Sequence, residues 1–149
     1  MSLKSNLSLK IQDTLNITKI IKAKDCKLWL SELVTKKSFI TIRIVSEKDS
    51  AKLNQQYRKI DKPTNILSFL IESNPLVGDL ILCHPIIKDE AKEQNKEIIS
   101  HYAHLVIHGY LHLLGYDHEN DKEAIEMEAK EIRALGRLGF PNPYTSNII

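Results

Sequence analysis

The chain has 149 residues, of which 42% are hydrophobic and 27% are charged, and its formal net charge at pH 7 is +2. These values predict one soluble globular domain, residues 1–149, and exclude a disordered or repetitive chain. The two cysteines, Cys26 and Cys83, exclude a disulfide framework, and no apolar run is long enough for a signal peptide or membrane span, so we expect a cytoplasmic protein without a membrane partner.

Three segments are predicted before residue 46. Apolar residues alternate loosely over residues 7–17, which predicts a strand followed by a turn at Asn16. Over residues 19–36 they recur at mixed spacing, which predicts one or two helical pieces. Residues 39–45 place isoleucines on one face and polar side chains on the other, and this alternation predicts a half-buried strand.

A helix and a short strand are predicted next. Ser46 followed three residues later by Asp49 resembles a capping box with aspartate in place of glutamate. It predicts a helix through about Arg58. Pro63 ends any such helix, and residues 66–70 read as a short strand.

The following segment is predicted to form a turn, a strand and then a helix. Pro75 and Gly78 are expected to bracket a turn that precedes an apolar strand at residues 79–83. A helical pattern then covers residues 86–93, and Asn95 is expected to break it.

Two longer helices complete the chain. They are predicted at residues 96–114 and 121–135, with an irregular tail over residues 141–149. Strands and helices are intermixed without a strict βαβ rhythm, so we expect an α+β domain. Its small mixed sheet should carry packed helices, with the helix at residues 96–114 in the centre.

The stretch HGYLHLLGYDH has the spacing of a metal site. His108 and His112 are four residues apart, so on a helix both imidazoles lie on one face and reach one ion. Gly115 is expected to end the helix in the left-handed conformation and turn the chain, so that His118 becomes a third ligand. Three imidazoles leave one position of a tetrahedral ion open, which is typical of catalytic zinc. We therefore predict one zinc ion per chain.

The same stretch differs from the zincin pattern HExxHxxGxxH at one decisive position. The glutamate that acts as general base in peptide hydrolysis is replaced by Gly109, which cannot accept a proton. Asp117 and Glu119 lie beyond the helix, where periodicity does not aim them at the metal. The site is predicted to be hydrolytic but not proteolytic. His104 shares the face of His108 and is expected to support the site, to face the substrate, or to be a hydrogen-bonded core residue.

Charge is divided along the chain. Residues 1–62 contain 14 Lys and Arg against 6 Asp and Glu, a balance of +8, whereas the remainder has a balance of −6. A positive surface beside a metal favours a polyanionic substrate such as nucleic acid. A solvated lysine-rich surface explains the charge equally well.

The chain resembles the YbeY family of bacterial metal-dependent endoribonucleases over about residues 46–140. The stretch HGYLHLLGYDH carries the resemblance, together with NQQYRKIDKPTNILSF (residues 54–69), similar to NxxYRxxDxPTDVLSF of the family, and VGDLILC (residues 77–83). Two positions depart from the family pattern. Asn65 replaces the usual aspartate and Leu70 replaces a common proline.

The resemblance implies an α+β fold, one Zn²⁺ held by His108, His112 and His118, and a role for Arg58 in the active cleft. It implies a single-strand-specific, zinc-dependent endoribonuclease in ribosomal RNA maturation, including 3′-end processing of the small-subunit rRNA and ribosome quality control. The expected partners are single-stranded rRNA precursor and the ribosome or its assembly proteins, with no DNA.

Residues around Arg58 fit an RNA substrate. The guanidinium of Arg58 offers a fork of donors for phosphate oxygens, so Arg58 and the ligand His108 are the predicted catalytic residues. A tyrosine beside basic residues stacks on unpaired bases, so Tyr57, Lys59 and Lys62 are predicted to bind substrate with Arg58.

Two other functions remain open on sequence alone. One is a zinc-dependent hydrolase of a peptide or small-molecule substrate. The other is a non-catalytic ribosome- or RNA-binding assembly factor with a structural metal. The sequence also leaves open the native metal and whether water or the 2′-hydroxyl of the RNA is the nucleophile.

Overall fold

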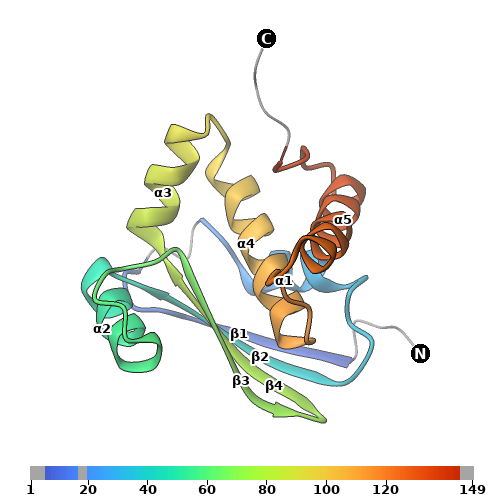
Figure 1. The fold of residues 1–149 in the computed structure, drawn as a ribbon, viewed down its shortest axis with the longest axis horizontal. Helices are drawn as coiled ribbons and strands as arrows, with labels where there is room; N and C mark the ends of the chain where they lie inside the picture. Colours follow the sequence, from blue (N-terminus) through green and yellow to red (C-terminus); the bar gives the residue numbers. More distant parts are fainter. Residues whose placement is uncertain (1–5, 17–19, 145–149) are drawn as a thin grey trace.

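A computed structural model describes residues 6–16 and 20–144 of the chain. It contains a four-stranded sheet in the order β1-β2-β4-β3, with helices packed on it (Figure 1). The elements in chain order are β1 (Leu7–Asp13), α1 (Ala23–Leu30), β2 (Ser38–Val45), α2 (Glu47–Arg58), β3 (Ile66–Ser73), β4 (Leu76–Cys83), α3 (His84–Glu93), α4 (Ile98–Leu113) and α5 (Asp121–Arg137).

The sheet is mixed, as predicted. Strands β1, β2 and β4 are parallel, and β3 pairs antiparallel with β4 at one edge. The predicted half-buried strand is β2, whose isoleucines Ile40, Ile42 and Ile44 are at most 2% exposed. The α+β fold class expected from the sequence is confirmed.

Helix α4 lies at the centre of the domain. It crosses one face of the sheet between α3 and α5 (Figure 1), and 11 of its 16 residues are buried. The opposite face carries a smaller cluster, in which Leu53 of α2 packs against Val45, Leu67 and Ile81. Because two of the predicted metal ligands, His108 and His112, lie on this buried helix, the core itself fixes their positions.

The predicted helix boundaries are mostly confirmed. Ser46 caps α2 by accepting a hydrogen bond from the Asp49 N–H at 3.2 Å. Asn95 separates α3 from α4 with a left-handed φ of 54°, and Asn120 caps α5 by accepting from the Glu123 N–H at 2.9 Å. Residues 20–36 contain one helix, α1. Residue 19 of its predicted range and residue 17 of the preceding predicted strand lie outside the described residues.

Two predictions about the strands need correction. The first strand ends at Asp13, although the predicted turn at Asn16 is present with a φ of 58°. The predicted turn between Pro75 and Gly78 is wrong, because the chain turns at residues 74–75 and Gly78 lies inside β4. A Cβ on Gly78 would lie 2.7 Å from Leu113 Cδ1, so this glycine serves the close approach of α4.

Gly109 also marks a close approach of α4 to the sheet. A Cβ built there would lie 2.7 Å from Ile66 Cδ1 and 2.8 Å from Leu80 Cδ2. The position that holds the zincin glutamate therefore faces the sheet and is filled by side chains of β3 and β4. A larger residue at 109 would have to displace that packing.

Alanine substitutions at two helical glycines should have opposite effects on stability. Gly109→Ala should lower the free energy of unfolding by about 1–3 kcal/mol, because its methyl group overpacks the core. Gly136→Ala should raise it by up to about 1 kcal/mol, since nothing lies within 4 Å of a Cβ in that position. Thermal denaturation followed by circular dichroism measures both, and equal shifts for the two variants would contradict the assigned contact.

Two sequence-based expectations about composition can be compared with the structure. Cys26 and Cys83 are free and buried, as predicted. Among the described residues, none of the helices has both the length and the apolar character needed to cross a membrane.

Candidate metal centre and adjoining cleft

The three predicted histidine ligands come together in the structure. The Nε2 atoms of His108 and His112 are 3.1 Å apart. The ring of His118 lies 5.5 Å from that of His108 and 5.0 Å from that of His112, centroid to centroid. One potential ligand nitrogen from each residue lies within 4.8 Å of the others. The predicted convergence is therefore observed, while metal ligation itself stays a prediction.

Gly115 turns the chain as the sequence predicted. It has a φ of 105°, and its N–H donates to the His112 carbonyl at 3.0 Å. The Tyr116 N–H donates to the Leu111 carbonyl, also at 3.0 Å, which completes a Schellman motif. This turn brings His118 back beside the last turns of α4.

The donor set fits a tetrahedral zinc ion. Zn–N bonds of about 2.0–2.1 Å place two ligand nitrogens about 3.3–3.4 Å apart, close to the 3.1 Å between the Nε2 atoms of His108 and His112. Burial lowers the pKa of His112, and the neighbouring imidazoles lower it further. His112 is thus disposed to be neutral, as a metal ligand must be.

Glu131 of α5 is a functional candidate that the sequence reasoning missed. Its side chain is fully buried, and its Oε2 atom lies 2.6 Å from Nδ1 of His108. With Nδ1–H donating to the carboxylate, the lone pair of His108 is on Nε2, the atom that faces His112. Carboxylate–histidine pairs of this kind orient metal-bound imidazoles in proteins.

The Glu131 carboxylate is held by three donors in all. Its Oε1 atom accepts from His104 Nε2 at 3.1 Å and from the hydroxyl of Tyr144. Burial raises the pKa of the Glu131 carboxyl, but its hydrogen bonds outweigh burial and lower the pKa to about 2. Of the roles expected for His104, support of the site is the one that its contact with Glu131 favours.

The sequence contained a signal for Glu131, but it was hidden among other glutamates. The Glu131 side chain is 0% exposed, so it is buried rather than part of the charged outer face of α5. Glu131 lies four residues after Met127 and four before Leu135, and both of these are buried. A carboxylate on the apolar stripe of an amphipathic helix is the signal.

Replacing Glu131 should weaken metal binding without unfolding the domain. Glu131→Gln keeps the size of the side chain but loses the charge that orients His108. Zinc affinity should fall by about 10–100-fold, as measured by competition with a chromogenic chelator. Glu126→Gln, on the exposed side of α5, is the matched control and should bind zinc like the parent protein. Parental zinc affinity in Glu131→Gln would argue against this role.

A cleft of about 720 Å³ opens beside the three histidines. Its walls include residues of α2, β3, the end of α4 and the following loop. Arg58 and Tyr57 line it together with His108, His112 and His118. The predicted catalytic residues thus share one cleft, whereas Lys59 and Lys62 are exposed and are not among its lining residues.

Buried polar contacts place Arg58 at this cleft. The loop after α2 is tied back to the helix, because Ser50 Oγ donates to the Thr64 carbonyl at 3.0 Å and Asn54 Nδ2 donates to the Lys62 carbonyl at 2.9 Å. The last turn of α2 therefore lies beside β3. The ring of Tyr57 packs against Phe69 of β3, with centroids 4.7 Å apart.

The structure gives a local reason for one of the two departures from the family pattern, that of Asn65. Asn65 Nδ2 donates to Glu90 Oε1 at 3.0 Å, and His101 Nε2 lies 2.9 Å from the same oxygen. An aspartate at 65 would place a second carboxylate against Glu90, so asparagine suits this neighbour. Leu70 is 53% exposed and borders an irregularity in the pairing of β3 with β4.

The fold and the site define a class: a small α+β domain with a three-histidine candidate metal centre that opens on a cleft containing an arginine. Comparison with known families is consistent with this class. The family model described as "Endoribonuclease YbeY" matches residues 5–139. The chain therefore belongs to the YbeY family.

Individual relatives agree with this assignment. The chain is 53% identical over 115 residues to "Endoribonuclease YbeY" of Alcanivorax borkumensis, an alignment covering 71% of this chain and 66% of that protein. It is 48% identical over 140 residues to the protein of the same name from Colwellia psychrerythraea, covering 85% and 90%. The solution structure of TM1509 from Thermotoga maritima is similar, with a TM-score of 0.61 and 25% identity, covering 93% of this chain and 99% of that one.

Proposed function

We propose that this chain is a single-domain, zinc-dependent endoribonuclease that cleaves single-stranded precursor rRNA during ribosomal RNA maturation. The observation that carries the proposal is the meeting of three histidines and one arginine in a single cleft. Membership of the YbeY family supports the same activity. The proposal extends to 3′-end processing of the small-subunit rRNA and ribosome quality control, with the ribosome or its assembly proteins as cytoplasmic partners.

Each site residue has a defined task in this proposal. His108, His112 and His118 would hold one zinc ion, with Glu131 fixing the ring of His108. When bound, the ion supplies Lewis acidity and lowers the pKa of a coordinated water toward about 7. Arg58 binds non-bridging phosphate oxygens, and its charge opposes the negative charge that develops on these oxygens during cleavage.

Peptide hydrolysis is disfavoured by the position of Gly109. The zincin base would stand at this residue, but its Cβ position is packed against Ile66 and Leu80. A glutamate there would have to displace this packing. Nothing in the comparisons favours a peptide or small-molecule substrate, or a purely structural metal.

The test is RNA cleavage by the metal-loaded protein. Purified protein should cut single-stranded RNA and rRNA precursor and leave duplex RNA and casein intact. Cleavage should stop when a chelator is added. The His112→Ala protein serves as the inactive control. Cleavage of RNA that persists in both the chelated protein and the variant would overturn the proposal.

The basic first part of the chain should contribute to RNA affinity. Lys59→Glu with Lys62→Glu should reduce both the affinity for single-stranded RNA and its salt dependence. Each phosphate contact contributes about −0.7 to the slope of the logarithm of the binding constant against the logarithm of the salt concentration. The matched control is Lys122→Glu with Lys130→Glu in α5, where Lys130 lies over the ring of Tyr116. Filter binding across a salt series measures both. Equal losses from the two pairs would mean that the basic part is only a solvated surface.

A further inference from the structure

A second cavity adjoins the candidate metal centre. It has a volume of about 400 Å³ and runs beside the N-terminal half of α4. It shares three lining residues with the cleft that contains Arg58, namely Asn65, Ile66 and His108. A linear polymer that is bound at the metal centre and extends past His108 would therefore enter this second cavity.

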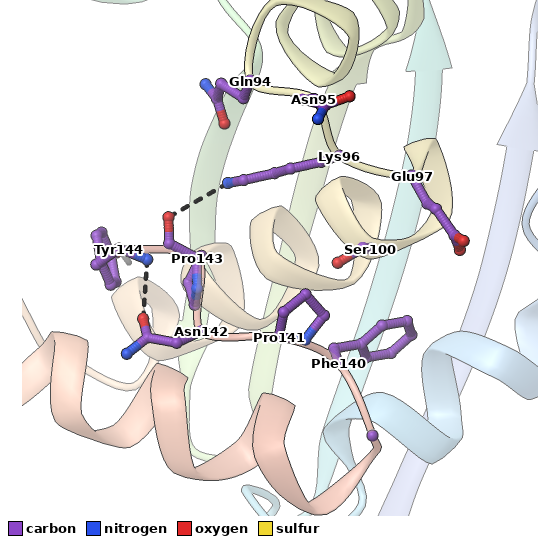
Figure 2. A pocket seen from close by; sticks show the side chains of 11 residues that line it. Gln94, Asn95, Lys96, Glu97, Ser100, Phe140, Pro141, Asn142, Pro143 and Tyr144 are labelled. Carbon is purple, nitrogen blue, oxygen red and sulfur yellow. Dashed lines mark hydrogen bonds between the residues drawn. The ribbon is translucent and has the colours of Figure 1, made fainter. Parts of the chain in front are cut away.

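The second cavity continues into a third, larger one. This third cavity has a volume of about 850 Å³ and lies between the α3–α4 connection and the segment after α5. Figure 2 shows Lys96 extending across it toward Pro143, with Tyr144 nearby. Lys96, Gln94, Pro143 and Tyr144 line both cavities. The three cavities thus adjoin one another in a series that begins at Arg58 and passes His108, and we call this series the groove.

The second cavity contains one cation with unused donors. Among the described residues that line it, Lys96 is the only lysine or arginine. The Lys96 ammonium donates one hydrogen bond, to the Pro143 carbonyl at 3.4 Å, which is long (Figure 2). The carboxylate of Glu90 is already engaged by Asn65 and His101. An anionic group in the cavity would find Lys96 accessible as its partner.

The cavity also offers an aromatic ring. Tyr144 is 43% exposed, and its ring packs edge-on against His104, with centroids 5.3 Å apart and an interplanar angle of 85°. Its hydroxyl is anchored on the buried Glu131. A partly exposed ring that is anchored through its hydroxyl is suited to stacking on a base. A cation and an aromatic ring along a groove are the usual elements of single-strand binding.

We propose that this second cavity is a nucleotide subsite for the single-stranded RNA next to the cleaved bond. Lys96 contacts a backbone phosphate, and Tyr144 stacks on a base. We name it the Lys96 subsite and define it by Asn65, Gln94, Lys96, His104 and Tyr144. The inference rests on the proposed function, because it concerns a substrate strand that the metal centre would cut.

The test compares two lysine variants of the metal-loaded protein. Lys96→Met removes the charge and keeps the apolar stem. Lys92→Met is the matched control, because Lys92 is exposed on α3 and is not among the groove-lining residues. In cleavage of a single-stranded RNA oligonucleotide, Lys96→Met should raise KM about fivefold with little change in kcat. It should also make the slope of the logarithm of the RNA-binding constant against the logarithm of the salt concentration shallower by about 0.7. Lys92→Met should match the parent protein.

A second readout does not depend on turnover. RNA carrying 4-thiouridine should crosslink on irradiation to a peptide that contains Tyr144, and Lys96→Met should weaken this crosslink. If the parent protein cleaves RNA but Lys96→Met and Lys92→Met have the same KM and crosslinking, the Lys96 subsite is wrong and the proposed function stands. If the parent protein neither cleaves nor binds RNA, both proposals fail.

Discussion

His112→Ala should abolish metal binding and RNA cleavage together. Parent protein should carry about one divalent transition metal per chain, held by His108, His112 and His118. Loss of His112 leaves two imidazoles, too few for the three protein ligands that a catalytic zinc site requires. Cleavage should fall at least about a thousandfold, because neither Lewis acidity nor an acidified water remains. Elemental analysis and cleavage of single-stranded RNA measure the two losses.

The control for this variant is another histidine of the same chain. His84 lies at the start of α3, where its Nδ1 contacts the hydroxyl of Tyr102 at 2.7 Å, outside the histidine cluster. His84→Ala should keep full metal occupancy and cleavage. Circular dichroism should show both variants folded. Full metal occupancy in His112→Ala would remove His112 from the ligand set.

The local part of the metal centre could be predicted from the sequence, because each of its features depends only on residues nearby in the chain. His108 and His112 share a helix face through helical periodicity alone. The left-handed conformation of Gly115, with its φ of 105°, follows from the preference of glycine at helix ends. The capping of α2 by Ser46 is equally local. Such features are set by residues within one or two turns.

Features that depend on distant contacts were missed or misplaced. Glu131 meets His108 across 23 positions of sequence, and nothing local distinguishes it from the other glutamates of α5 except the buried stripe on which it lies. Gly78 resembled a turn residue, but its small size serves the contact with Leu113. Composition and spacing describe single segments, whereas these roles arise only when two segments pack.

The cleft is an intermediate case. The charge division along the chain and the segment around Arg58 indicated a phosphate-binding region, and the structure places Arg58 and Tyr57 in the cleft of the three histidines. Sequence patterns alone could not separate them from Lys59 and Lys62, which are close by in the chain but outside the cleft lining. The left-handed φ of 61° at Lys59 ends α2 there and turns the chain away.

Arg58→Ala should reduce RNA cleavage strongly while leaving fold and metal intact. Arg58 is exposed in the last turn of α2, so its removal leaves no cavity in the core. If its guanidinium opposes charge that develops on the transferring phosphate, kcat should fall about 10²–10³-fold. Arg58→Lys should restore only part of the rate, since an ammonium lacks the planar fork that holds two oxygens.

The control is Lys52→Ala, which removes one positive charge from an exposed position of the same helix. Its cleavage rate should remain near that of the parent protein, because Lys52 is not among the residues that line the cleft. Steady-state cleavage of single-stranded RNA is measured together with the zinc content of the same samples. This separates a loss of catalysis from a loss of metal. A parental rate for Arg58→Ala would rule out the proposed role of Arg58. Equal losses for Arg58→Ala and Lys52→Ala would reduce that role to general charge attraction, which should also weaken steeply with salt.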